Sequence, residues 1–139
     1  MRVCDIMTKA PLIIPEGTSV EDAARMMRDH KIGLLPIGNK KRIAGVITDR
    51  DITIRVTAES KDPKRTGVLE VMTPDGAYCF EDQDIEDACF MMEEKHVRRL
   101  MVFDRTHDLV GILSLDDIAA RARKEKLAGY ALSKVGKVA

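Results

Sequence analysis

The sequence has no tryptophan, and aromatic residues make up only 4% of its 139 residues. Rings that stack on exposed bases are therefore scarce, which argues against a protein that binds single-stranded nucleic acid. The 23 basic and 23 acidic residues cancel, so no overall field attracts nucleic acid or an anionic membrane. An anionic ligand must therefore be held by local charge.

Cysteine and long apolar runs are scarce as well. The three cysteines, Cys4, Cys79 and Cys89, are odd in number and lack the CxxC spacing, which argues against a disulfide framework and a thiolate zinc site. No run reaches the roughly 18 apolar residues of a transmembrane helix, and residues 1–5 do not resemble a signal peptide. We expect a cytoplasmic protein with no metal site, whose cysteines are buried as small hydrophobic residues.

The remaining composition is that of a globular protein. Hydrophobic residues account for 45% of the chain and charged residues for 33%, which suits one compact domain or two very small ones. A chain of this length removes roughly 68% of its unfolded surface from water when it folds. It therefore needs neither disulfides nor metal ions to be stable.

The chain contains an internal repeat with an offset of 65 residues. Identical or similar residues recur in the second half, and after one inserted residue Gly45 matches Gly111. The identical matches are Met7-Thr8 with Met72-Thr73, Glu16 with Glu81, Glu21-Asp22-Ala23 with Glu86-Asp87-Ala88, Met26-Met27 with Met91-Met92, and Leu35 with Leu100. A repeat at a fixed offset predicts two copies of one structural unit.

Each copy has about 60 residues, which is too few for comfortable stability alone. We therefore expect the two copies to pack on each other about a pseudo-twofold axis. The predicted organisation is repeat 1 at residues 1–57, a linker at 58–67, repeat 2 at 68–122, and a basic C-terminal tail or helix at 123–139.

The apolar periodicity changes in the same order within each copy. A helical stripe begins at Val20 and again at Ile85, and we expect Thr18 or Ser19 to cap the first helix and Asp84 to cap the second. Short apolar runs predict strands, and a last helix begins near Thr48 and near Ser114. The predicted strands are Leu12–Ile14, Leu34–Ile37, Ile43–Ile47, Tyr78–Phe80, Leu100–Phe103 and Leu109–Leu113. The predicted fold is α/β (α+β), each copy being β-α-β-β-α with helices on one face of a small sheet.

The order of these elements and the repeated motifs resemble the CBS domain, and two copies resemble a tandem CBS pair (Bateman module) of the stand-alone bacterial type. The motifs are Asp5-Ile6-Met7-Thr8 with Glu70-Val71-Met72-Thr73, and Gly45 to Asp51 with Gly111 to Asp117. The resemblance implies a regulatory or signalling module that binds AMP, ADP, ATP, NAD or S-adenosylmethionine in the cleft between the repeats. It also implies a homodimer of CBS pairs.

A hydroxyl and a carboxylate lie three positions apart at the start of each last helix. Thr48 with Asp51 and Ser114 with Asp117 suit a ribose, because a carboxylate accepts hydrogen bonds from two neighbouring hydroxyls, and free helix N–H groups are available for sugar or phosphate. The same spacing is that of a capping box, which needs no ligand. The residues leave both interpretations open, and the resemblance favours ribose.

Cations that could hold phosphate lie beside one of the two motifs. Arg98 and Arg99 precede an apolar strand, and only one of them can face a given cleft because strand side chains alternate. The matching residues of repeat 1 are Gly33 and Leu34, so the two clefts are expected to differ in charge. Arg50 is a second phosphate candidate, and a solvated helix arginine is an equally good interpretation.

The adenine ring is expected in an apolar slot rather than between aromatic rings. The residues before or at the start of the first strands are its candidate lining, namely Ala10, Pro11, Leu12, Ala77 and Tyr78. His96 is interpreted as a surface histidine, and the paired methionines as core residues.

The leading prediction is an adenine-nucleotide-binding regulatory module that senses AMP, ATP or a related adenosyl ligand and acts on an unknown client protein. The alternative is a structural or dimerisation module with no ligand. An enzyme is disfavoured because no phosphate-binding glycine loop, zinc motif or catalytic triad is recognisable.

Overall fold

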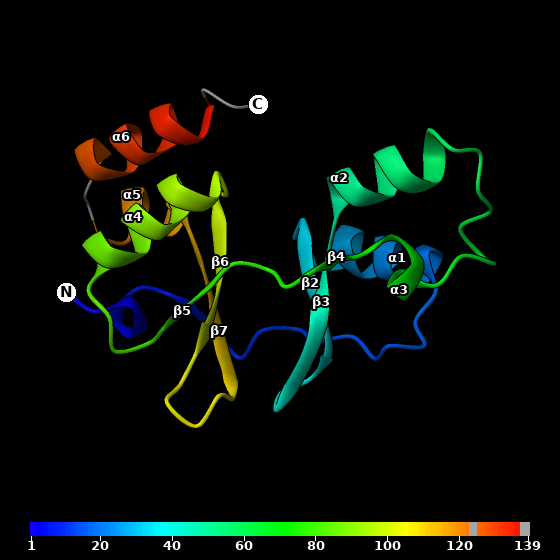
Figure 1. The fold of residues 1–139 in the computed structure, drawn as a ribbon, viewed down its shortest axis with the longest axis horizontal. Helices are drawn as coiled ribbons and strands as arrows, with labels where there is room; N and C mark the ends of the chain where they lie inside the picture. Colours follow the sequence, from blue (N-terminus) through cyan, green and yellow to red (C-terminus); the bar gives the residue numbers. More distant parts are fainter. Residues whose placement is uncertain (123–124, 137–139) are drawn as a thin grey trace. The chain divides into compact units, whose positions relative to one another are not determined.

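A computed structural model describes residues 1–122 and 125–136. The chain forms two compact units, which we describe separately. The central unit is Leu12–Gly76, and the terminal unit combines Met1–Pro11 with Ala77–Ala139 (Figure 1).

The central unit is built on a three-stranded antiparallel sheet of order β2-β3-β4. Its helices are short except for the first, and α2 continues directly into a single π-helical turn, η2. The elements are α1 (Val20–His30), β2 (Leu34–Asn39), β3 (Arg42–Thr48), α2 (Asp49–Ile52), η2 (Thr53–Thr57), α3 (Val68–Val71) and β4 (Thr73–Pro74).

The terminal unit is built on a four-stranded sheet of order β1-β7-β6-β5. Strands β5 and β6 are parallel, and the other pairs are antiparallel. The elements are a 3-10 turn η1 (Val3–Asp5), β1 (Thr8–Lys9), β5 (Tyr78–Phe80), α4 (Ile85–Lys95), β6 (Arg99–Phe103), β7 (Leu109–Ser114), α5 (Leu115–Ala120) and α6 (Glu125–Gly136).

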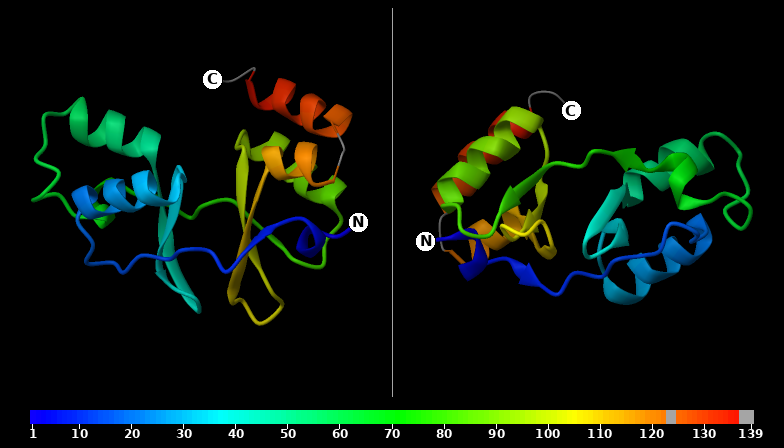
Figure 2. Two further views of the ribbon diagram at one scale, coloured as in Figure 1. Left: turned by 180° about the vertical axis from the view of Figure 1, so that it is seen from behind. Right: turned by 60° about the horizontal axis from the view of Figure 1, so that its bottom comes forward.

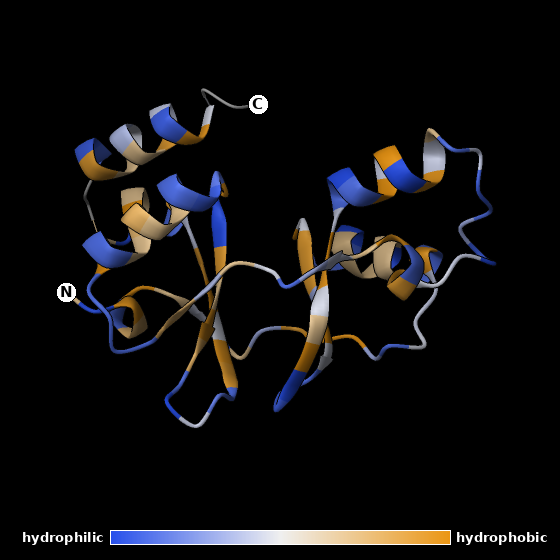
Figure 3. Ribbon diagram, in the orientation of Figure 1, coloured by the Kyte–Doolittle hydropathy of each residue, from blue (hydrophilic) through white to orange (hydrophobic). Residues whose placement is uncertain are grey.

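In each unit the helices lie on one side of the sheet (Figures 1 and 2). Alternate strand residues face these helices: Leu35 and Ile47 in the central unit, and Leu100 and Leu113 in the terminal unit, are at most 1% exposed. Apolar colouring follows the strands, and polar residues gather at the hairpin tips and on outer helix faces (Figure 3). Each unit therefore has its own hydrophobic core.

The two compact units do not coincide with the two sequence repeats, because the first strand of each repeat pairs with the sheet formed by the other repeat. Strand β1 pairs with β7, and β4 pairs with β3. This pairing explains the repeated glycines. A Cβ on Gly45 would lie 2.6 Å from the carbonyl oxygen of Thr73, and one on Gly111 would lie 2.5 Å from Met7 Sδ. At Gly45 the close atom is backbone, so only glycine lets the exchanged strand approach so closely there, whereas at Gly111 the nearest atom belongs to the flexible Met7 side chain.

The predicted mixed α/β architecture and the order of its elements are confirmed, with differences in detail. Ser19 caps α1, since its side chain accepts a hydrogen bond from the Asp22 amide. The predicted side-chain cap at Asp84 is wrong, because that side chain makes no capping bond to α4. The predicted strand Leu12–Ile14 is reduced to a single bridge between Ile14 and Ile37. Sequence periodicity had no means of detecting the two-residue strands β1 and β4.

Part of the basic C-terminal segment forms α6, which packs against α4 and α5. Ala128, Ala131 and Val135 are buried, and the first two join the core of the terminal unit. Residues 123–124 and 137–139 of the predicted tail lie outside the described residues. Among the residues that the structure describes, no helix is both long and apolar enough to span a bilayer.

Candidate functional site

The Thr48–Asp51 turn of the central unit forms a complete capping box. The Asp51 amide donates to Thr48 Oγ1 at 3.1 Å, and the Thr48 amide donates to Asp51 Oδ2 at 2.9 Å. The Thr73 hydroxyl, from β4, donates to both carboxylate oxygens at 3.3 and 3.4 Å. The Asp51 side chain is 11% exposed, so it is held on several sides.

The Ser114–Asp117 turn of the terminal unit has the same geometry. The Asp117 amide donates to Ser114 Oγ at 3.1 Å, and the Ser114 amide donates to Asp117 Oδ2 at 3.0 Å. The Asp117 side chain is 13% exposed. Thr8, which matches Thr73 in the repeat, is exposed. The carboxylate of Asp117 therefore lacks the hydroxyl donor that Asp51 has within its unit.

The helix N–H groups at these turns are less free than the sequence suggested. The first amide of each helix donates to a carbonyl just before the neighbouring strand β2 or β6, from Asp49 to Gly33 and from Leu115 to Arg98, both at 3.0 Å. The Arg50 amide donates to Asp49 Oδ1 at 2.9 Å. The expectation that the first amides of α2 are free for a ligand is therefore wrong, because the Asp49 amide donates to Gly33 and the next two amides donate within the turn.

Two arginines that the sequence analysis missed lie beside the carboxylates. Arg55 Nη1 is 3.7 Å from Asp51 Oδ1 and donates to the carbonyls of Val71 and Met72, each at 2.9 Å. Arg121 Nε is 3.6 Å from Asp117 Oδ1, and its Nη1 donates to the carbonyls of Ile6 and Met7 at 3.1 and 3.2 Å. Their 66-residue separation, which equals that of Gly45 and Gly111, was the signal that could have revealed them.

The strand register distinguishes Arg99 from Arg98. Arg99 is the direct partner of Ser114 across β6 and β7, whereas Arg98 precedes the strand and accepts the Leu115 amide with its carbonyl. Side chains directly opposite each other share one face of an antiparallel pair. Leu34 pairs with Thr48 at the matching position of the central unit, so only the terminal unit has a cation there.

The candidate adenine residues are divided between the two units. Ala77 and Tyr78 lie in the same unit as Ser114, and Tyr78 pairs with Met101, which is two residues beyond Arg99 on the same strand face. Ala10 and Pro11 also belong to the terminal unit, whereas Leu12 belongs to the central unit. Arg50 and Thr48 lie in the central unit, and the Arg50 residue is exposed, as a solvated arginine would be.

Three of the five aromatic residues gather on one corner of the terminal sheet. The ring of Tyr78 meets those of Phe80 and Phe103 edge to face, with centroids 5.9 and 5.6 Å apart. The Arg105 guanidinium lies 4.2 Å above the Phe80 ring and makes two hydrogen bonds of 2.9 Å to Asp82. That hydrogen bonding lowers the pKa of the Asp82 carboxyl. Nothing in the sequence indicated that Phe103 and Arg105 would join Tyr78 and Phe80, because they lie more than 20 residues further along the chain.

The largest pKa shifts belong to buried thiols. Burial raises the pKa of Cys79 to about 12 and that of Cys89 to about 11. Both residues are 1% exposed, as expected for small hydrophobic residues, whereas the expectation is wrong for Cys4, which is only partly buried. Within residues 1–122 and 125–136, no three His, Cys, Asp or Glu side chains are placed to hold a metal ion. His96 is an exposed C-cap of α4, which agrees with its surface interpretation.

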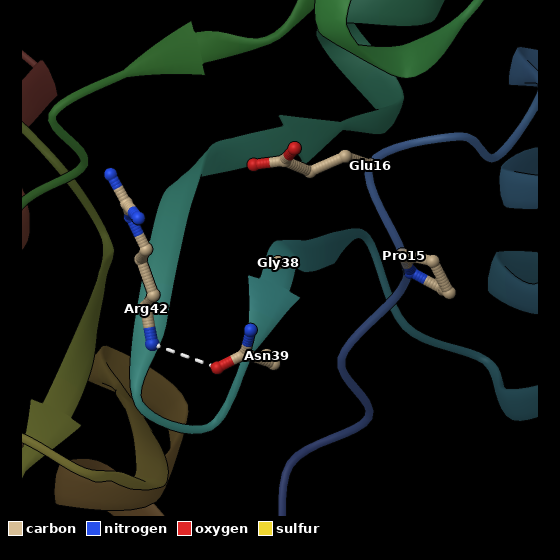
Figure 4. Close-up of a pocket in the computed structure, with 5 residues that line it drawn as sticks. All are labelled: Pro15, Glu16, Gly38, Asn39 and Arg42. Atoms are coloured by element: carbon tan, nitrogen blue, oxygen red, sulfur yellow. Dashed lines mark hydrogen bonds between the residues drawn. The ribbon is translucent and has the colours of Figure 1, made fainter.

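A polar hollow of about 590 Å³ opens at the other end of the central sheet (Figure 4). Glu16 approaches it from the segment before α1, and Arg42 from the start of β3. The Arg42 amide donates to Asn39 Oδ1 at 3.1 Å, which closes the β2–β3 turn. None of the predicted site residues lines this hollow. It is therefore a separate feature from the Thr48–Asp51 turn.

Sequence comparison identifies both repeats. The pattern of the CBS domain matches residues 3–57 and 68–124. The chain is 33% identical over 133 residues to the CBS domain-containing protein YhcV of Bacillus subtilis, covering 96% of this chain and 94% of that protein.

Solved structures share the fold, and the following are three of them. Hypoxic Response Protein I, crystallised with two coordinated zinc ions, is 37% identical with a TM-score of 0.76, over 86% of this chain and 97% of that one. The CBS domain pair of MJ0100, in complex with 5-methylthioadenosine and S-adenosyl-L-methionine, is 28% identical with a TM-score of 0.78, over 91% and 98%. CBSX2 in complex with AMP is 27% identical with a TM-score of 0.73, over 90% and 98%. With both repeats matched and its twin turns formed, this chain belongs to the CBS domain family, as a tandem pair.

Proposed function

We propose that the chain is a regulatory module that binds an adenosyl ligand and has no catalysis of its own. In this proposal, the Ser114–Asp117 turn holds the ribose and Arg99 holds the phosphate. The observation that carries it is the register of β6 and β7, which makes Arg99 the direct neighbour of Ser114. Related CBS pairs that bind AMP, 5-methylthioadenosine or S-adenosylmethionine support the ligand class.

The two turns are proposed to differ in their ligands. The terminal unit offers a carboxylate, a hydroxyl and Arg99, whereas the central unit has Leu34 in place of that arginine and Thr73 already bonded to Asp51. At this strand position, a phosphate can therefore pair with an arginine in the terminal unit but not in the central unit. We propose that the Ser114–Asp117 turn prefers AMP or ATP, and that the Thr48–Asp51 turn prefers uncharged adenosyl groups.

Calorimetric titration of the whole chain with AMP, ATP, NAD, S-adenosylmethionine and adenosine tests the proposal. Asp117→Asn keeps an oxygen that can accept the Ser114 amide but removes the charge, so it is expected to weaken AMP tens-fold while leaving the capping box formed. Asp116→Asn is the matched control, because Asp116 is an exposed acid of the same helix turn. Equal AMP affinity in wild type and Asp117→Asn would contradict the assignment.

Phosphate recognition is tested with the neighbouring arginines. Arg99→Gln is expected to weaken AMP about tenfold and adenosine hardly at all, because only AMP presents a phosphate. Arg98→Gln is expected to change neither affinity. A loss that is the same for AMP and adenosine would mean that Arg99 acts on the fold rather than on phosphate.

A structural or dimerisation module with no ligand is the second candidate. The observation that favours it is that both capping boxes are complete without a ligand. The absence of heat and of any thermal shift with all five compounds would favour this candidate. The homodimer, the client protein and the cytoplasmic location stay predictions.

A further inference from the structure

The segments that the two repeats exchange are each held by one arginine. Arg121 donates from a single nitrogen to the carbonyls of Ile6 and Met7, and Arg55 does the same for Val71 and Met72. These carbonyls lie at or just after the ends of the short helical turns η1 and α3, immediately before β1 and β4. Carbonyls at the end of a helical turn lack partners within the turn, so an arginine fork is a suitable donor for them.

Each of these arginines also reaches the carboxylate of its own turn. The contacts are to the oxygen that the capping box leaves free: Oδ1 of Asp117 at 3.6 Å and Oδ1 of Asp51 at 3.7 Å. The carboxylates are largely buried, whereas the arginine side chains are about half exposed. The same arrangement forms independently in both units, so it is a property of the repeated fold and not of one surface.

We propose that Arg121 and Arg55 are positioning residues that couple each carboxylate to the exchanged segment in front of it. The inference rests on the proposed function, in which these carboxylates accept the ribose hydroxyls. The guanidinium fixes the orientation of Oδ1 while it holds the segment Ile6–Lys9 or Val71–Pro74. A ligand that needs the oriented carboxylate therefore favours the docked segment. By linkage, a docked segment favours the ligand by the same factor.

Amide hydrogen exchange of the whole chain tests the coupling without assuming a ligand. Arg121→Gln and Asp117→Asn are each expected to speed exchange across residues 6–9 about tenfold, while residues 71–73 and helix α1 keep wild-type rates. The double variant is expected to add little, because both changes remove the same link. Arg55→Gln is expected to give the mirror result, with faster exchange at 71–73 only.

The ligand arm uses AMP as the probe. Saturating AMP is expected to slow exchange across residues 6–9, and Arg121→Gln is expected to weaken AMP about tenfold, with partial recovery in Arg121→Lys, which keeps the charge but not the fork. Arg28→Gln is the control, because Arg28 is an exposed helix arginine paired with its neighbour Asp29. It is expected to change neither readout.

Two results would overturn the coupling. One is unchanged exchange at residues 6–9 in Asp117→Asn, which would show that the carboxylate does not hold the segment through Arg121. The other is wild-type AMP affinity in Arg121→Gln despite faster exchange at residues 6–9. That result would show that Arg121 holds the segment but has no effect on AMP binding at the Ser114–Asp117 turn. If wild type binds none of the adenosyl compounds, the proposed function fails, and the Asp117→Asn exchange result then decides the coupling by itself.

Discussion

At the scale of single residues, the structure shows which contacts the two motif carboxylates already make. Asp51 and Asp117 complete capping boxes, which the sequence already offered as the alternative to ribose binding. The structure shows the cap to be formed in both cases, and a formed cap still leaves Oδ1 of each carboxylate for a second partner. The cap by itself does not exclude the proposed ribose binding, because Oδ1 takes no part in it; at Asp51 this oxygen already accepts from the Thr73 hydroxyl.

The buried thiols give a prediction about pH. The pKa of Cys79 is raised by burial to about 12, so the folded chain keeps this proton while the unfolded chain loses it near pH 9. The stabilising effect is fully present below pH 9 and disappears as the pH rises towards 12. In that window the thiol is expected to lower the free energy of unfolding by about 1.4 kcal/mol per pH unit.

Urea unfolding followed by circular dichroism between pH 8 and pH 10.5 measures this slope. Cys79→Ala is expected to be less stable than wild type at pH 8, because it leaves a cavity, but to lose stability more slowly as the pH rises. Val102→Ala, which removes the buried residue that pairs with Cys79 across β5 and β6, is the control for the cavity alone. Parallel slopes in wild type and Cys79→Ala would contradict the prediction.

At the scale of elements, the predictable features are those with a period. The stripes of α1 and α4 and the long hairpin strands follow from their apolar spacing and were expected from the sequence. Strands β1 and β4 have two residues each, which is too short for any period, so their pairing could not be predicted. Their trace in the sequence is indirect: Gly45 and Gly111 recur because each lies under one of these strands.

The glycine under β4 gives a prediction about stability. In Gly45→Ala the new Cβ would lie 2.6 Å from the Thr73 carbonyl oxygen and 3.2 Å from the Pro74 Cα, both of them backbone atoms. The strand must shift, and we expect a loss of about 2 kcal/mol in the free energy of unfolding. Gly111→Ala is expected to cost less, because its nearest neighbour is the flexible Met7 side chain.

Thermal and urea unfolding of the glycine variants provide the measurement. Gly17→Ala is the matched control, since no atom lies within 4 Å of the added Cβ, and it is expected to stay within about 0.5 kcal/mol of wild type. A Gly45→Ala protein as stable as Gly17→Ala would show that β4 does not press on β3.

At the scale of the whole chain, the sequence repeat predicts two similar structures but not the boundaries of the two compact units. The repeat places Met7-Thr8 with the residues that follow them, whereas in the fold they join the second half of the chain. The candidate site shows the same division. Its motif residues were predictable from their recurrence, but the contacts of Arg121 with Ile6 and Met7 span most of the chain and depend on the exchange.

Because the two repeats exchange strands β1 and β4, we expect a fragment with the boundaries of a compact unit to fold better than a fragment with the boundaries of a repeat. Fragments 12–76 and 1–65 have the same length. Fragment 12–76 contains the full β2-β3-β4 sheet and its core, including Val68 and Val71, whereas 1–65 lacks both of these residues and β4. A unit of this size is only marginally stable, so losing part of its core is expected to prevent cooperative folding.

Circular dichroism during urea unfolding is expected to show a cooperative transition for fragment 12–76 and none for fragment 1–65. Fragment 1–65 also exposes Val3 and Ile6, whose core partners lie in the missing part of the chain. If 1–65 unfolds as cooperatively as 12–76, the exchanged strands are dispensable, and the repeat rather than the compact unit is what folds.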